Sequence, residues 1–305
     1  MPLPNNCPLC LSEREHQSVV TSHVYGKDKE KSNAFFECES CEVIYQYPFL
    51  SKEEEHFFYV AEFENFMSTR SGEDGGWLKS EDHIAANEEN RIRRMNYLSS
   101  FLTEPKEILE VGCSSGFMLY PLIKDGHSCT GIEPSGAFGN FLKKNNVESY
   151  SSIEELKNNS PRKRFDLVFH FFVLEHIRNP VEFLRELLGL LKPGGKIIFE
   201  IPNSSDPLYS IYDIPEFERF YWSVAHPWYF NKKSLSVLLK KINQPFDILL
   251  EQRYDLSNHL IWARDGKPGG MKRFTHIIGD RIDIEYKRML VDSGYCDTLI
   301  GVVHK

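Results

Sequence analysis

The chain has 305 residues, of which 41% are hydrophobic and 26% charged, the balance of an ordinary globular protein with a buried core. Its formal net charge of −8 disfavours a nucleic-acid-binding protein, because such proteins usually present a basic surface. The first residues lack the basic and apolar segments of a signal peptide, and no apolar run is long enough to span a bilayer. We therefore expect a cytoplasmic protein without membrane insertion.

Four of the seven cysteines form two Cys-x-x-Cys pairs, Cys7 with Cys10 and Cys38 with Cys41. Each pair places two thiolates on one tight turn, and two such turns complete a tetrahedral zinc site. Four protein ligands leave no open position, so we expect a structural Zn²⁺ that replaces the core that 50 residues cannot build alone. A redox pair is the alternative, but no thioredoxin-like strand and helix surround either pair.

Three parts follow from the pattern along the chain: a zinc-binding lobe at 1–50, a helical lid or linker at 51–104 and the main domain at 105–305. In the main domain, helical segments alternate with short strands, which we expect at 108–111, 129–133, 148–150, 165–170, 196–201, 246–254 and 298–304. This alternation predicts an α/β fold with one doubly wound, mostly parallel, seven-stranded Rossmann-like sheet. Segments 203–230 and 255–296 interrupt the pattern and are expected to be substrate-loop insertions.

A glycine loop follows the first strand of this domain, in the sequence Glu-Val-Gly-Cys-Ser-Ser-Gly at 110–116. Glycines at 112 and 116 let the backbone turn tightly and approach a ligand closely. Glu133 ends the next strand, the position from which a carboxylate accepts both ribose hydroxyls of an adenosine. The pattern therefore predicts a nucleoside site at the ends of these two strands.

Two other chemistries use a similar loop. A dinucleotide site prefers G-x-G-x-x-G, and here position 114 is serine and position 117 phenylalanine. A serine hydrolase would use Ser114 as the nucleophile of a G-x-S-x-G elbow, with Asp206 or Asp213 and then His226 following in hydrolase order. Neither Glu110 nor an acid at the end of the next strand is explained by the elbow.

Segment 108–116 resembles the first motif of class I S-adenosylmethionine (SAM)-dependent methyltransferases. The resemblance continues in order through 131–135, 165–168, 173–177 and 191–196, and so covers about residues 105–205. It implies an enzyme whose cofactor is SAM. The cofactor-binding residues that it implies are Gly112, Ser114, Gly116, Glu133, Ser152, Ile153, His170 and Phe171, with the ribose held by Glu133, the adenine flanked by 152 and 153, and the sulfonium beside 170 and 171.

The residues around the second cysteine pair indicate which group of methyltransferases the chain resembles. An RNA-reading zinc module predicts basic residues there, but Glu37, Glu39 and Glu42 are acidic. Segment 36–48 instead resembles zinc-containing methyltransferases of bacterial sugar and surface-polysaccharide pathways, which include sugar C-methyltransferases acting on nucleotide-linked deoxysugars. The resemblance implies a small sugar or nucleotide-linked sugar as acceptor, a zinc lobe and helices that form a lid, and a role in carbohydrate biosynthesis. The sequence carries no signal for an oligomeric state.

Methyl transfer to a hydroxyl or a carbon needs a base near neutral pH, and histidine is the usual supplier. We expect His176 to be structural. We expect His226, in the aromatic segment after the fifth strand, to be the general base, with packing in the aromatic loop as the alternative. In the sugar C-methyltransferases the corresponding segment has a tyrosine and then a Glu-His pair, which Tyr221 and His226 match, so the resemblance implies that both are catalytic residues. Ala225 stands in place of the glutamate, which favours O-methylation. The alternatives are sugar C-methylation, RNA methylation with the zinc lobe as reader, and the serine hydrolase.

Overall fold

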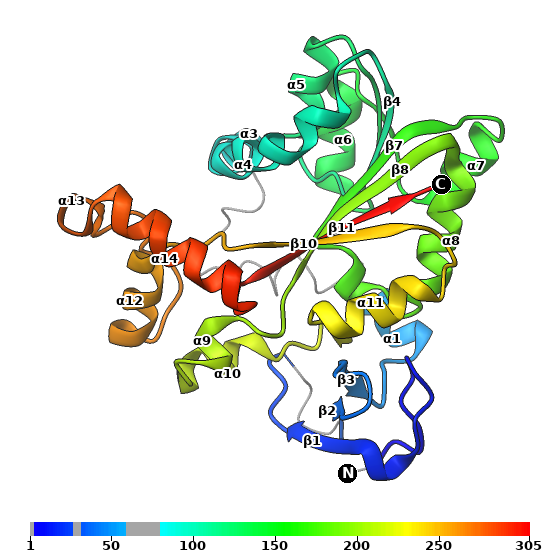
Figure 1. Ribbon diagram of the computed structural model, residues 1–305. Coiled ribbons are helices and arrows are strands. Elements are labelled where there is room, and N and C mark those ends of the chain that lie inside the picture. Colours follow the sequence, from blue (N-terminus) through cyan, green and yellow to red (C-terminus); the bar gives the residue numbers. More distant parts are fainter. Residues whose placement is uncertain (1–2, 27–31, 59–79) are drawn as a thin grey trace. The chain divides into compact units, whose positions relative to one another are not determined.

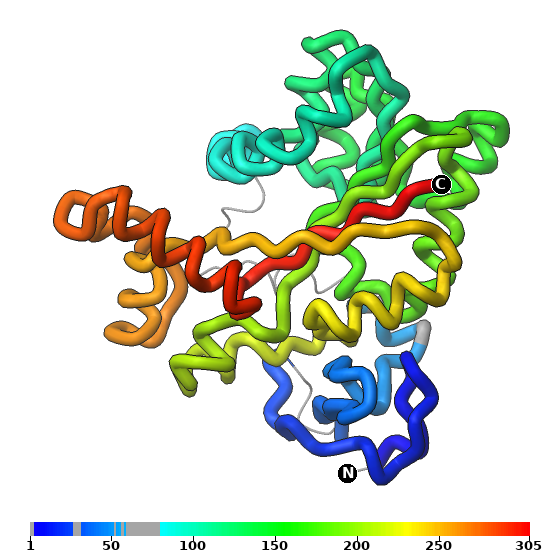
Figure 2. The backbone as a smooth tube through the Cα atoms, in the orientation of Figure 1, coloured from blue at the N-terminus to red at the C-terminus, as the bar shows by residue number. Residues whose placement is uncertain are grey.

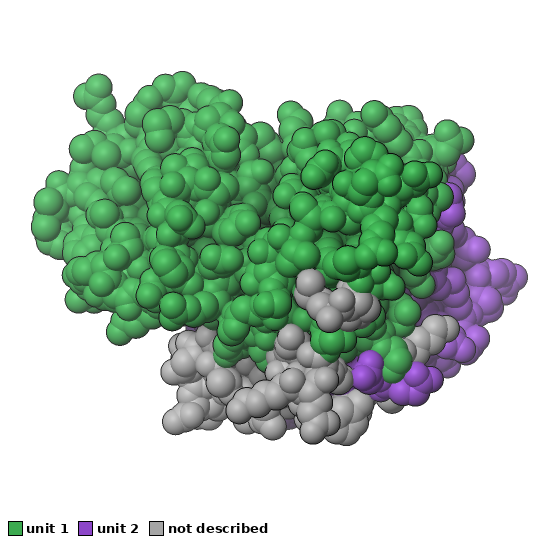
Figure 3. Space-filling model, turned by 90° about the horizontal axis from the view of Figure 1, so that it is seen from below, with its two compact units in different colours: residues 1–51, 174–183, 200–301 green, residues 52–173, 184–199, 302–305 purple. Residues whose placement is uncertain are grey.

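The computed structural model describes residues 3–26, 32–58 and 80–305 (Figure 1). The chain divides into two compact units, coloured separately in Figure 3. Unit 1 comprises residues 1–51, 174–183 and 200–301, and unit 2 comprises residues 52–173, 184–199 and 302–305. Part of the predicted helical lid, residues 59–79, lies outside the described residues; α1 (Lys52–Phe57), α3 (Ser80–Ala86) and α4 (Glu88–Leu98) flank it.

The predicted seven-stranded α/β sheet is confirmed, in the order β10-β11-β8-β7-β4-β5-β6. Its strands are β4 (Glu107–Val111), β5 (Ser128–Ile132), β6 (Glu148–Tyr150), β7 (Phe165–Phe171), β8 (Leu191–Pro202), β10 (Phe246–Glu251) and β11 (Thr298–His304). Strand β4 pairs in parallel with both β5 and β7. The chain order reverses between β4 and β7, so the sheet is doubly wound, and the loops after these strands flank the switch point at which such sheets bind ligands.

Helices of unit 2 alternate with these strands as α5 (Leu119–Lys124), α6 (Gly136–Lys144) and α7 (Ile153–Asn159), while α8 (Pro180–Leu190) begins in unit 1 and ends in unit 2. Serine N-caps begin two of them: Ser135 accepts a hydrogen bond from the amide of Phe138, and Ser152 accepts one from the amide of Glu155. The central strands are buried along most of their length, which is why the sequence shows apolar runs there.

Unit 1 contains a small antiparallel sheet with the order β1-β2-β3-β9, in which Cys38 ends β2 and Cys41 lies in the turn before β3. It comprises β1 (Gln17–Thr21), β2 (Ala34–Cys38), β3 (Ile44–Tyr47) and β9 (Trp228–Tyr229). In the register of β3 with β9, Ile44 pairs with Tyr229 and Tyr45 with Trp228. The lobe predicted at 1–50 therefore takes its fourth strand from the aromatic segment, which a two-residue strand does not reveal in the sequence.

The rest of unit 1 is largely helical and contains both predicted insertions. Its helices are α9 (Pro207–Ser210), α10 (Pro215–Tyr221), α11 (Lys232–Lys240), α12 (Leu256–Asp265), α13 (Thr275–Ile278) and α14 (Asp280–Ser293). The last three follow β10 and precede β11, and the tube in Figure 2 shows these two strands side by side. No helix among the described ranges is long and apolar enough to cross a membrane.

Candidate functional site

The glycine loop after β4 adopts the backbone that its sequence predicts. Gly112 has φ 73° and Gly116 has φ 79°, in the left-handed region that favours glycine. A Cβ on Gly112 would lie 2.7 Å from Val173 Cγ2, and one on Gly116 would lie 2.7 Å from Leu142 Cδ2. The two glycines are therefore required by the backbone conformation and by the packing around the loop.

The carboxylate of Glu133 fastens this loop to the end of β5. One oxygen accepts a hydrogen bond from the Ser114 amide at 2.7 Å, and the other accepts one from the Ser135 amide at 2.8 Å. The side chain is buried, with 8% exposed. A carboxylate has about four acceptor lone pairs, so Glu133 can accept from two ligand hydroxyls while it holds both amides.

Arg94 of α4 brings a buried positive charge to the same part of unit 2. Its side chain is 5% exposed, and its Cζ lies 4.0 Å from the centroid of the Phe171 ring, a cation–π contact. In β4, directly before the glycine loop, burial raises the pKa of the Glu110 carboxyl to about 8, although the positive charge of Arg94 lowers it. Sequence reasoning missed Arg94, because nothing in the run Arg91, Arg93, Arg94 indicates which arginine is buried.

The remaining predicted cofactor residues lie at the ends of β6 and β7. Ser152 is exposed and caps α7, and Ile153 begins that helix. His170 is fully buried, and its ring stacks on Phe199 with centroids 4.8 Å apart. Burial lowers the pKa of His170 to about 3, so the ring is neutral. In the β4–β7 register His170 lies opposite Val111, which brings the residues after β7 to the glycine loop.

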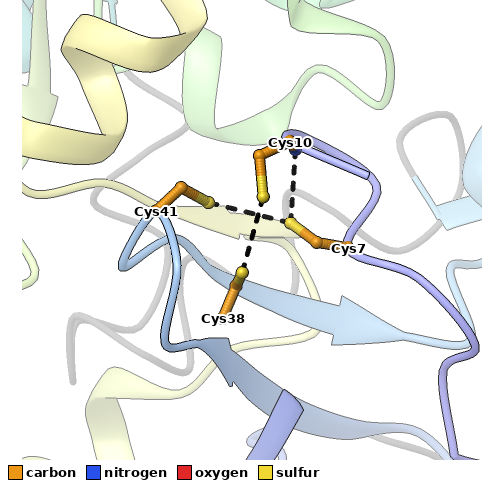
Figure 4. A group of neighbouring side chains, drawn as sticks. All are labelled: Cys7, Cys10, Cys38 and Cys41. Carbon is orange, nitrogen blue, oxygen red and sulfur yellow. Dashed lines mark hydrogen bonds between the residues drawn. The ribbon is translucent and has the colours of Figure 1, made fainter. Parts of the chain in front are cut away.

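The two cysteine pairs converge on one point in unit 1 (Figure 4). Cys7 Sγ lies 3.7 Å from Cys41 Sγ, and Cys10 Sγ lies 3.6 Å from Cys38 Sγ. Thiolates around a tetrahedral Zn²⁺, each about 2.3 Å from the ion, are separated by about 3.8 Å. The spacing and the four-thiol donor set therefore fit a tetrahedral metal ion.

Amide and hydroxyl groups surround the same sulfurs. The amides of Leu9 and Cys10 both donate to Cys7 Sγ at 3.4 Å. The hydrogen bond from the Cys41 thiol, followed by these two amide bonds, lowers the pKa of Cys7 to about 5 despite its burial. On the other pair, Ser12 Oγ lies 3.0 Å from Cys38 Sγ. Such donors stabilise the thiolate form that binds a metal.

The aromatic segment around Tyr221 forms part of the core of unit 1. Tyr221 is buried and donates its hydroxyl to the Asn203 carbonyl at 3.0 Å, and its ring lies 4.9 Å from that of Tyr229. Burial raises the pKa of Tyr221 well above its usual value. Most aromatic side chains of the segment are packed in this way.

His226 is half-buried at the end of a turn whose geometry is fixed by its neighbours. Its amide donates to the Ser223 carbonyl at 3.0 Å, and the Ser223 amide in turn donates to the Tyr229 hydroxyl oxygen at 3.0 Å. His176 lies beside it, with ring centroids 4.6 Å apart and an interplanar angle of 82°. Glu175 completes the group: one polar atom from each of the three side chains lies within 4.8 Å of the others.

Sequence reasoning considered His176 and His226 separately and did not bring them together. The only signal was the adjacent pair Glu175-His176, which also occurs where such a pair is purely structural. Only the fold therefore brings these three side chains together.

Comparison with known proteins identifies the family. Residues 83–244, more than half of the chain, match a family described as a methyltransferase domain. A ubiquinone biosynthesis O-methyltransferase of Coxiella burnetii is 27% identical over 202 residues, which cover 60% of this chain and 83% of that protein. A tRNA U34 carboxymethyltransferase of Hydrogenovibrio crunogenus is 31% identical over 116 residues, 34% of this chain and 35% of that protein. The chain thus spans about a third of the length of the tRNA-modifying relatives.

A solved structure of a SAM-dependent methyltransferase from Archaeoglobus fulgidus is similar at 17% identity, with a TM-score of 0.48, over 80% of this chain and 100% of that one. The family match covers the glycine loop, Glu133 and the whole segment from β4 to β9. It excludes the serine hydrolase and dinucleotide interpretations of the loop. Because the matching family model covers more than half of the chain, the chain belongs to the methyltransferase domain family.

Proposed function

We propose that this enzyme transfers the methyl group of SAM to a hydroxyl of a small sugar or nucleotide-linked sugar, with His226 as general base. The observation that carries the proposal is the histidine itself: it is half-buried on a turn fixed by Ser223 and lies against a second imidazole. The hydroxyl proton passes to His226 while the oxygen–methyl bond forms and the sulfur–methyl bond breaks. The bonding electron pair stays on sulfur, and S-adenosylhomocysteine (SAH) leaves.

Cofactor binding in this proposal uses the residues of unit 2. Gly112, Ser114 and Gly116 line the methionine and ribose portions, and Glu133 accepts the ribose hydroxyls. Ser152 and Ile153 flank the adenine, and His170 and Phe171 border the sulfonium. To these we add Arg94, whose guanidinium, 4.0 Å from the ring of residue 171, suits the cofactor's carboxylate. Tyr221 acts through packing, because its hydroxyl is bonded to a backbone carbonyl.

We propose that the four-cysteine cluster binds a structural Zn²⁺. The sulfur spacing and the amide donors to Cys7 support this assignment, and four thiolates leave no position for a substrate. When bound, the ion crosslinks the turn of Cys7 and Cys10 to the β2–β3 turn. A reducing compartment such as the cytoplasm would keep these thiols available for the metal.

Two features support an oxygen of a small molecule as acceptor. The Coxiella relative, of which this chain covers 83%, is named as an O-methyltransferase. The surface beside the cysteines is unsuited to RNA phosphates: Glu37 and Glu39 are acidic, and Lys233 and Asn231 are both bonded to Glu42, each at 2.8 Å. The sugar itself is supported by the resemblance of segments 36–48 and 221–226 to sugar methyltransferases.

A tRNA acceptor is the second candidate, because two relatives that are 31% identical are named as tRNA-modifying enzymes. Purified enzyme with methyl-labelled SAM should be tested against UDP- and dTDP-linked sugars, a catechol and total tRNA. We expect label in an alkali-stable ether of a nucleotide-linked sugar. His226→Asn should bind SAH normally and transfer no label, whereas Glu133→Gln should fail at cofactor binding. Labelling of tRNA alone would overturn the small-molecule assignment.

A further inference from the structure

A carboxylate and a second imidazole lie beside His226, from a segment about fifty residues earlier in the chain. They belong to the 3₁₀ helix η5 (Leu174–His176) of unit 1. Glu175 is 2% exposed, and its carboxylate, the His176 ring and the His226 ring each place a polar atom within 4.8 Å of the other two. The two rings meet nearly at right angles.

One hydrogen bond defines the proton position on His176. Its Nδ1 lies 2.8 Å from the carbonyl oxygen of Ala225. A carbonyl oxygen only accepts, so Nδ1 is the donor, and the neutral ring then carries no hydrogen on Nε2. Nε2 of His176 is therefore an acceptor. The same bond joins η5 to the residue directly before His226, so the two imidazoles are held together through the backbone as well as by their ring contact.

The cluster also supplies what position 225 lacks. The residue before His226 is Ala225, which offers no carboxylate to the base. Glu175 places a buried carboxylate in the same group of side chains without being adjacent in sequence. A nearby negative charge favours the imidazolium that forms when a histidine takes a proton, and the effect is strongest where water is excluded.

We propose that Glu175 and His176 are positioning residues for His226. One ring N–H of His226 donates to Nε2 of His176, which directs the opposite ring nitrogen to the acceptor, and the Glu175 carboxylate balances the charge after proton transfer. This inference rests on the proposed function, because it assumes that His226 is the base for methyl transfer.

The first test needs no acceptor. Long-range proton–nitrogen NMR spectra of histidine-labelled enzyme report which ring nitrogen carries the hydrogen. We expect His176 to be protonated on Nδ1, with Nε2 bare. His127 is an internal reference of the opposite kind, because its Nδ1 accepts from the Lys106 amide at 3.1 Å. A His176 that is protonated on Nε2 would overturn the proposal.

The second test separates positioning from simple packing. His176→Asn retains an amide N–H where Nδ1 donates to the Ala225 carbonyl but has no group in place of Nε2, whereas His176→Gln retains a polar group near Nε2. With the sugar acceptor from the labelling panel, we expect His176→Asn to lower kcat about 10- to 100-fold with unchanged KM for SAM, and His176→Gln to recover part of this loss. Full activity of His176→Asn would show that the histidine only packs.

Glu175→Gln tests the charge. It keeps the shape of the carboxylate and one acceptor oxygen but removes the negative charge, and we expect a similar loss in kcat with unchanged SAH affinity. Metal analysis of the same proteins provides a further check. If a second divalent ion per chain is found, and it is lost in His226→Asn but not in Cys38→Ser, then Glu175, His176 and His226 form a metal site and the proposal is overturned. If no sugar is methylated, the proposed function fails while the NMR result still decides the tautomer.

Discussion

Glu133→Gln is the variant that best tests the cofactor site. The native carboxylate accepts the Ser114 amide at 2.7 Å and the Ser135 amide at 2.8 Å, and its other lone pairs are assigned to the ribose. Glutamine has one acceptor oxygen, and its NH₂ group cannot accept from either an amide or a hydroxyl. At least one charged hydrogen bond to the ribose is lost, and each is worth about 1.5–3 kcal/mol. We therefore expect SAH to bind about 10- to 150-fold more weakly.

Isothermal titration calorimetry with SAH measures this change directly. Glu182→Gln, on the exposed surface of α8, is the matched control and should bind like the wild type. Thermal unfolding gives an independent measurement. SAH at 100 times its wild-type Kd stabilises the folded wild type by about 2.7 kcal/mol, and the same SAH concentration should stabilise Glu133→Gln by only about 0.3–1.4 kcal/mol. Equal SAH affinity of Glu133→Gln and the wild type would refute the assignment of Glu133 to the ribose.

Three further outcomes are expected. Arg94→Gln should weaken the binding of SAH about tenfold or more in calorimetry. It should leave the affinity for 5′-methylthioadenosine, which lacks the carboxylate, unchanged. Equal losses of affinity for both ligands would show that Arg94 only packs. Cys38→Ser should lower the zinc content measured by atomic absorption from one ion per chain to none and melt the lobe; retained zinc would contradict the four-thiolate site. The pKa of Glu110 in the folded state is about 8, above its ordinary value, so the free energy of unfolding should fall as the pH rises from about 4.5 to 8, by up to about 1.4 kcal/mol per pH unit. Glu110→Gln should flatten this pH dependence of the free energy of unfolding, measured by urea titration. An unchanged pH dependence would contradict a buried, protonated carboxyl.

Much of the main sheet could be predicted from the sequence, because strands buried on both faces read as short apolar runs between helices. The prediction for 148–150 matches β6, and that for 298–304 matches β11. Strand β8 is longer than predicted, since it begins at Leu191 and includes the Pro-Gly-Gly turn that normally argues against a strand.

The contacts that could not be predicted join residues far apart in the chain. Local periodicity does not indicate that Ile44 pairs with Tyr229, nor that the ring of His176 contacts the Ala225 carbonyl. The absence of a glutamate at position 225 favoured an oxygen over a carbon as the methyl acceptor, yet the carboxylate of Glu175 lies in the same group of side chains as His226. Adjacency in sequence therefore does not decide whether a carboxylate lies beside this histidine, because that property depends on adjacency in space.

The strand β9 has a consequence for the order in which the protein assembles on the ribosome. The cysteines span only residues 7–41, so the metal can join them early in synthesis. The β3 edge, however, must wait until Trp228 and Tyr229 have been made before it is paired. During that interval a metal bound by the cysteines would hold the three N-terminal strands together while β9 is still missing. We therefore expect the proposed metal to contribute most to the stability of the chain before β9 has been made.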